Sequence, residues 1–168
     1  MTDAERDAIR HFACAASRHL RDAQYLHDDE RRHTADHLFG FAAECAAKSL
    51  LLRFTTYEVT MKKKEDKPSD RPWIRKSADD ENPQMLGHIG AVLGAFPLLS
   101  HGRSGPKLME AEDKISAFDG WNLSHRYEDE VGPDGLPLIA PSLVAERRLA
   151  AECLLDLQAH VELTGMLP

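Results

Sequence analysis

Residues 37–52 constrain the fold most strongly, because they form a run of helical periodicity with almost no polar face. Small or apolar side chains stand at positions 38, 41, 42, 45, 49 and 52, and positions 39, 43, 46 and 50 fill the flank. A helix of low polarity on every side has to be surrounded by other elements. Its only strong charges, Glu44 and Lys48, stand four residues apart with the acid first, which predicts an ion pair on one face.

Further helices are predicted on both sides of this central one. Thr2 and Glu5 have the spacing of a capping box and open a helix that runs to about residue 28. The central helix extends from about residue 32 to about residue 60, and later helices are predicted at residues 84–99, 107–118 and 141–165. Short connections place successive helices antiparallel. We therefore expect an all-α fold, an antiparallel bundle of about five helices in a single domain over residues 1–168.

A charged segment at residues 61–83 interrupts the helical pattern. Residues 62–76 hold seven Lys or Arg against three Asp or Glu, beginning with Lys62, Lys63 and Lys64. This composition predicts a long solvated loop after the second helix, whose basic half could contact a phosphate backbone. The alternative is a mobile loop that its charges only keep soluble.

Charge and cysteine content restrict the class of protein. The net charge of -7 argues against a protein that coats nucleic acid by bulk attraction, so no DNA partner is predicted. The three cysteines form no Cys-x-x-Cys pair, and we expect buried free thiols rather than disulfides or zinc ligands. No apolar run approaches the ~20 residues that span a bilayer. The sequence therefore predicts a cytoplasmic protein that has no membrane segment and needs no cofactor.

Residues 119–130 contain the densest cluster of residue types that bind ligands. Trp121 is expected to dock on the bundle, and Arg126 is expected to meet either an acid or a ligand phosphate. If Arg126 pairs with Glu44 or Asp119, its role is to fix this segment to the bundle. If it meets a ligand phosphate, its role is in binding, and both interpretations stay open. His88 falls between apolar positions and is either a packing residue or a group that transfers protons.

Three parts of the chain carry a family resemblance. They are the helix around Glu44 and Lys48, the segment Gly87-His88-Ile89 after the variable region, and the Trp-x4-Arg-Tyr element that ends at Tyr127. In this order they resemble the HEPN superfamily (higher eukaryote and prokaryote nucleotide-binding domains), whose members are small helical bundles. The resemblance implies a helical module of a prokaryotic defence or toxin-antitoxin type system. Such a module would bind nucleotide, RNA or a partner protein such as a nucleotidyltransferase or an antitoxin.

Many members of that superfamily are metal-independent RNases that carry an Arg-x4-6-His motif in a late helix. The late helices of this chain lack the motif, because Arg147 and Arg148 have no histidine before His160. A binding module is therefore the preferred function. The alternative is a metal-independent RNase in which Arg126 stabilises phosphate charge and His125 or His88 transfers the proton.

The central helix carries side chains of the types that bind metal ions. His33, His37 and Glu44 could share one face as ligands, but the second helix that such a site needs, with its own carboxylate and histidine, is missing. No metal site is predicted. The predicted catalytic residues are Arg126, His125 and His88, and the predicted binding residues are Glu44, Lys48, Trp121, Tyr127, Lys62, Lys63 and Lys64.

Apolar side chains on the first and central helices also predict self-association. The apolar stripe of a single core would be complete without three of these side chains, namely Phe12, Phe39 and Leu50. Most homo-oligomers are two-fold symmetric dimers. We therefore expect a homodimer whose interface includes these side chains.

Overall fold

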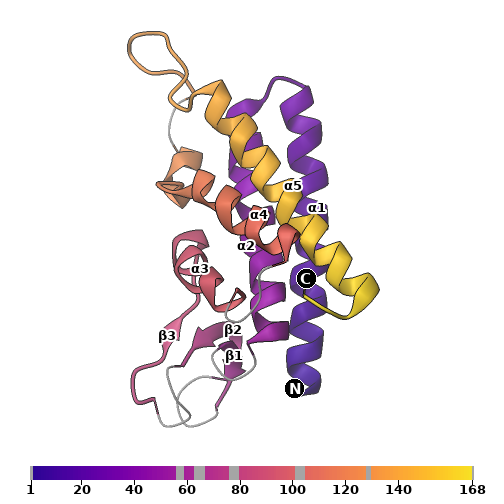
Figure 1. Ribbon diagram of the computed structural model, residues 1–168. Helices are drawn as coiled ribbons and strands as arrows, with labels where there is room; N and C mark the ends of the chain where they lie inside the picture. The colour runs from indigo at the N-terminus through magenta and orange to yellow at the C-terminus, as the bar shows by residue number, and fades with distance from the viewer. Residues whose placement is uncertain are drawn as a thin grey trace.

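The computed structural model describes residues 2–55, 59–62, 67–75, 80–100, 105–127 and 130–167, and over these residues the fold is mainly helical (Figure 1). The described residues form five α-helices, α1 (Asp3–Asp28), α2 (Arg32–Phe54), α3 (Ile89–Ala95), α4 (Pro106–Lys114) and α5 (Pro141–Thr164). Short 3-10 helices follow α3 and α4, at η2 (Phe96–Leu98) and η3 (Ile115–Phe118), and a separate one lies at η4 (Leu123–Tyr127). Among these described helices, none combines the length and the apolar composition needed to cross a membrane.

The capping box predicted at the start of α1 is confirmed. Thr2 N donates to Glu5 Oε2 at 2.8 Å, and Glu5 N donates to Thr2 Oγ1 at 3.2 Å. These reciprocal bonds satisfy amide groups that a helix start leaves without partners. Glu5 also accepts a hydrogen bond from Thr60 Oγ1 at 3.0 Å, which ties the first turn of α1 to the strand β1 (Val59–Lys62).

The predicted central position of α2 is confirmed. Figure 1 shows α1 and α2 side by side with α5 crossing in front of them, and α2 contacts α1, α3 and α5. Small side chains let these helices approach closely. Those of α2 that are completely buried include Ala42, Ala43, Ala46 and Ala47.

A small sheet stands where the sequence predicted only a charged loop, so the all-α prediction and the loop at residues 61–83 are wrong in this respect. Its strands are β1 (Val59–Lys62), β2 (Pro68–Ile74) and β3 (Gln84–Met85), and the order β1-β2-β3 is antiparallel throughout. The prolines of β2 do not prevent pairing, because Pro72 still accepts a hydrogen bond from Leu86 N at 2.9 Å. The helix predicted from residue 84 begins only at Ile89, since residues 84 and 85 pair with β2.

Trp121 is docked on α2, as predicted. Its indole ring is 7% exposed and its Nε1 donates to the backbone oxygen of Asp36 at 3.3 Å. The ring lies directly over Gly40, where an added Cβ would be 2.2 Å from Trp121 Cε2. The absence of a side chain at Gly40 therefore makes room for this ring.

Two of the side chains assigned to a dimer interface are not available on the surface. Phe39 and Leu50 are buried in the core of a single chain, because α2 is covered on their sides by its neighbours. Phe12 is partly buried and packs against the same core. The prediction that Phe39 and Leu50 are spare is wrong.

Candidate functional site

The predicted ion pair of α2 is present and buried. Lys48 Nζ lies 2.6 Å from Glu44 Oε1, and each of the two side chains is 8% exposed. Lys48 also donates to the backbone oxygen of Gly87, just before α3, and its ammonium group lies 5.6 Å from the centre of the Phe12 ring. The pair therefore links α2 to the segment that precedes α3. A buried charge of either sign is tolerated only when it is paired in this way.

His88 lies at the edge of this pair, and we call Glu44, Lys48 and His88 the Glu44 site. His88 Nδ1 lies 3.6 Å from Glu44 Oε2, an oxygen that has no hydrogen-bond partner among the described residues. The imidazole is 65% exposed, so His88 is not the packing residue that was one of its two interpretations. The structure thus brings together three predicted site residues.

Arg126 and Tyr127 lie elsewhere, on the surface formed by η4. The guanidinium carbon of Arg126 is 4.5 Å from the centre of the Tyr127 ring, and Tyr127 is 77% exposed. Arg126 is also exposed, and in the described part of the chain it pairs with neither Glu44 nor Asp119. The predicted contact of Arg126 with an acid is therefore wrong for those two partners. Trp121, not Arg126, anchors this segment on α2.

Arg147 of α5 is an almost completely buried arginine, with 2% of its surface exposed. Its Nη1 lies 3.0 Å from Asp36 Oδ1 and 2.8 Å from Asp36 Oδ2, and its Nε donates to Ala117 O at 2.9 Å. Burial raises the pKa of the Asp36 carboxyl, and the charge and hydrogen bonds of Arg147 oppose that rise. Sequence reasoning missed this pair. The signal was that Arg147 falls on the apolar stripe of α5 with Val144, Ala151 and Leu154.

Three histidines surround Trp121 and Asp36 at this end of α2. His37 stacks on Trp121 with ring centres 5.3 Å apart. Burial lowers the pKa of His37, and the nearby charges of Arg126, His33 and His125 lower it further. One ring nitrogen in each is buried without a hydrogen-bond partner among the described residues, namely His33 Nε2, His37 Nδ1 and His125 Nδ1. We call the exposed Arg126 and Tyr127, with the half-buried His37 and His125, the Arg126 surface.

The histidines do not assemble the metal site that was weighed from the sequence. In the described ranges, no three or more His, Cys, Asp or Glu side chains come together in a way that could hold a metal ion. Glu44 is paired with Lys48 and is not shared with His33 and His37. Of the basic cluster, Lys62 ends β1 and is partly buried, and Lys63 and Lys64 lie outside the described residues.

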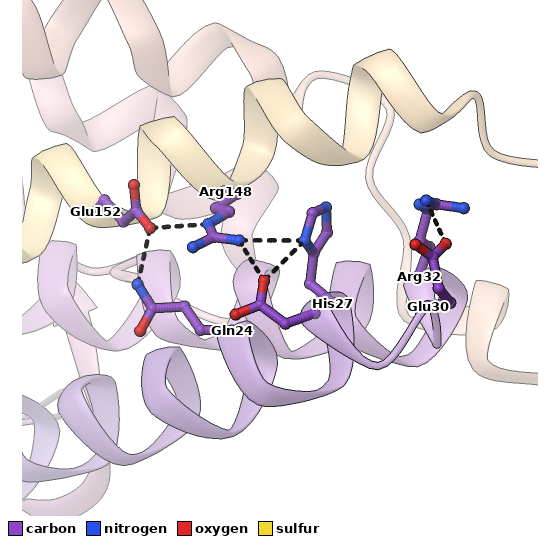
Figure 2. Close-up of polar contacts among 7 residues, drawn as sticks. Gln24, His27, Glu30, Arg32, Arg148 and Glu152 are labelled. Atoms are coloured by element: carbon purple, nitrogen blue, oxygen red, sulfur yellow. Dashed lines mark hydrogen bonds and ion pairs between the residues drawn. The ribbon is translucent and has the colours of Figure 1, made fainter.

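A separate polar network ties α5 to the end of α1 (Figure 2). Arg148 Nη1 donates to Asp28 Oδ1 at 2.9 Å and contacts His27 Nδ1 at 3.1 Å. Arg148 Nε and Gln24 Nε2 both donate to Glu152 Oε1, at 3.0 and 2.7 Å. The hydrogen bond from Arg148 is the largest cause of a lowered pKa at Asp28. Since its members already have partners, this network has a structural role.

The cysteines match their prediction only in part. All three are free thiols, but Cys14 is exposed and Cys45 and Cys153 are only partly buried. Burial raises the pKa of Cys45 to about 11, which leaves little thiolate at neutral pH.

Comparison with known proteins adds no relative. No protein-family model, no curated protein and no solved structure matches the chain.

Proposed function

We propose that the chain is a HEPN-like antiparallel helical bundle that serves as a binding module of a prokaryotic defence or toxin-antitoxin type system. The order of the resembling segments along the chain supports this family. The mainly helical fold and the buried Glu44–Lys48 pair in its central helix are consistent with it. The proposed ligand is single-stranded RNA or a nucleotide, and the proposed binding site is the Arg126 surface.

The observation that carries this proposal is the stacked and exposed pair of Arg126 and Tyr127. Nothing in the packing of the bundle requires an aromatic ring that is 77% exposed. An exposed tyrosine ring can stack on an unpaired base, and a guanidinium group can stack or bind a phosphate. The net charge of -7 means that affinity has to come from such local contacts and not from bulk attraction.

The test is the affinity for a short fluorescent single-stranded RNA, measured by anisotropy at low salt. Arg126→Ala and Tyr127→Ala are each expected to weaken binding by about tenfold, the usual effect of losing one stacking contact. Arg10→Ala is the matched control, because Arg10 is also an exposed arginine but lies on α1 in an ion pair with Asp7. An equal loss in all three variants, or no binding by the wild type, would contradict the proposal.

A second candidate function is metal-independent RNA cleavage, which the neighbouring positions of Arg126, His125 and His37 favour. Arg126 would stabilise the phosphate charge and His125 would transfer the proton. We expect no cleavage of labelled single-stranded RNA in the presence of a chelator, because the late-helix motif is missing. Robust cleavage that Arg126→Ala abolishes would establish the RNase instead.

We also propose that the module is a homodimer. Support comes from a hollow between α1 and α2, lined by the exposed Tyr25 and the partly buried Leu26 and Leu38 with Arg21 and Asp22 beside them. A patch that carries both charge signs can pair with a copy of itself across a two-fold axis. Light scattering that gives a monomer mass at micromolar concentration would contradict this.

A further inference from the structure

We propose that His88 is a phosphoryl-acceptor histidine, because its exposed imidazole presents Nδ1 to the buried Glu44 carboxylate and leaves Nε2 free for attack. The donor class is a small or protein-bound acyl phosphate or N-phosphoryl compound. Glu44 is the positioning residue of this site, and Lys48 holds Glu44 in place. This inference is independent of the proposed RNA-binding function, which uses the Arg126 surface.

The two oxygens of Glu44 have different surroundings. Oε1 is taken by Lys48 at 2.6 Å, whereas Oε2 has no hydrogen-bond partner in the described chain and faces His88 Nδ1 at 3.6 Å. A buried carboxylate oxygen without a hydrogen bond lowers the stability of the fold unless a donor reaches it. His88 Nδ1, which lies 3.6 Å from that oxygen, is placed to supply such a donor. Contacts of this length in ligand-free sites shorten when the reactive complex forms.

The position of the carboxylate selects the tautomer of the ring. At 3.6 Å His88 Nδ1 and Glu44 Oε2 are not hydrogen-bonded. When Nδ1–H donates to this carboxylate in the reactive complex, the proton is held on Nδ1 and Nε2 carries the lone pair. The ring is 65% exposed, which lets a donor approach Nε2 from solvent. A ring nitrogen open to solvent and a carboxylate beside the other ring nitrogen form an arrangement that can activate a histidine as a nucleophile.

Among the described histidines, only one other has a carboxylate near a ring nitrogen. His27 Nδ1 lies 3.6 Å from Asp28 Oδ1, but the same nitrogen lies 3.1 Å from the guanidinium of Arg148. That cation would oppose a positive charge on the His27 ring. Glu44 is also paired with a cation, Lys48, but through its other oxygen. The difference is that Arg148 contacts the His27 ring directly, whereas no cation contacts the His88 ring among the described residues.

The transfer step balances with phosphoramidate as the donor. The donor reacts as its N-protonated form, in which the nitrogen is an ammonium group. The lone pair of His88 Nε2 attacks phosphorus, the P–N bond breaks, and neutral ammonia leaves with the electron pair of that bond and its three protons. The His88 ring keeps its Nδ1 proton and becomes positively charged at the moment when Nε2 bonds to phosphorus. Glu44 stabilises this charge from the other side of the ring.

The experiment treats the full chain with phosphoramidate at neutral pH and follows phosphoryl addition by intact mass and by site mapping under non-acidic conditions. We expect the phosphoryl group on His88, and we expect His88→Asn to abolish the main product. His11→Asn is the control, because His11 is an exposed histidine on α1. Circular dichroism of each variant confirms that it is folded.

The role of Glu44 is tested separately by its conservative replacements. Glu44→Gln keeps the shape of the side chain and is expected to slow phosphorylation of His88 by about tenfold or more. Glu44→Asp restores the negative charge and is expected to recover part of the rate, which a purely structural role would not produce. Phosphoryl groups spread over several histidines without preference for His88, or a preference for His11, would overturn the proposal. An unchanged rate in Glu44→Gln would overturn the role of Glu44.

Discussion

His37 lies between an indole ring and several positive groups, and this position determines its protonation. Burial beside Trp121 disfavours the charged imidazolium, and Arg126, His33 and His125 disfavour it further, so the pKa of His37 is lowered from its ordinary 6.5. A histidine with a lowered pKa in the folded state stabilises the fold above its unfolded pKa. This part of the free energy of unfolding is lost as the pH falls below about 6.5. In that range His37 binds a proton in the unfolded chain but not in the folded chain.

The first prediction concerns Arg126 as a cause of this lowered pKa. In Arg126→Ala, the pKa of His37 is expected to rise toward its ordinary value, since one of the repelling charges is gone. An NMR titration of the His37 ring protons measures it, and Tyr127→Ala is the control because it removes the neighbouring ring but no charge. In wild type, urea unfolding should show lower stability at pH 5.5 than at pH 7.5, and His37→Gln should reduce that difference. A His37 pKa that is the same in wild type and Arg126→Ala would refute this placement of Arg126.

Gly40 and Trp121 together decide how the segment after η3 is held on α2. Alanine normally stabilises a helix relative to glycine by about 0.5–1 kcal/mol. At position 40 the added Cβ would lie 2.2 Å from the Trp121 ring, and a rigid ring in contact with His37 and Phe41 cannot yield locally. The clash should therefore outweigh the gain in helix propensity.

The second prediction follows from this contact. Gly40→Ala is expected to lower the free energy of unfolding by about 1–3 kcal/mol, the usual cost of overpacking a core. Gly94→Ala is the matched control, because Gly94 lies in α3 with no atom within 4 Å of an added Cβ, and it should leave stability unchanged or raise it. Urea denaturation measures both. Equal effects of the two substitutions would mean that Trp121 does not pack on Gly40.

The sequence predicted α2 and the capping box of α1 because both depend on residues close together in the chain. Helical periodicity and a three-residue capping motif are local signals. The sheet was missed because its strands are short, and because the prolines and charges of β2 are typical of loops. What makes β2 a strand is pairing with β1 and β3, and its own residues carry no alternating apolar pattern that would predict this pairing.

In the candidate site too, only the contact between residues close together in the chain could be predicted from the sequence. Glu44 and Lys48 were identified correctly as a buried pair, since their spacing on one helix is enough to bring them together. The distribution of the remaining residues over two sites was not predictable. It depends on how the segment before α3 and the 3-10 helix η4 dock on different ends of α2, and that is decided by tertiary packing.

Arg147 and Asp36 connect two long helices, since one side chain comes from α5 and the other from α2. Both are almost completely buried, so each charge depends on the other for its stabilisation. Arg148, the next residue, faces the end of α1 in a network that remains partly open to water. Two adjacent arginines of one helix therefore offer a direct comparison of a buried and a partly exposed ion pair.

The last prediction uses this comparison. Arg147→Ala leaves the Asp36 carboxylate buried without its partner and is expected to lower the free energy of unfolding by about 3–5 kcal/mol. Arg148→Ala should cost much less, because water can replace the lost contacts of an exposed pair. The loss in Arg147→Ala should be smaller at pH 4.5 than at pH 7, since without the arginine the already raised pKa of Asp36 rises further and the acid stays neutral at low pH. In an Asp36→Asn background, Arg147→Ala should cost less than in wild type, and urea denaturation of all these variants measures the differences. Equal losses for Arg147→Ala and Arg148→Ala at pH 7 would show that the buried pair does not hold α5 on α2.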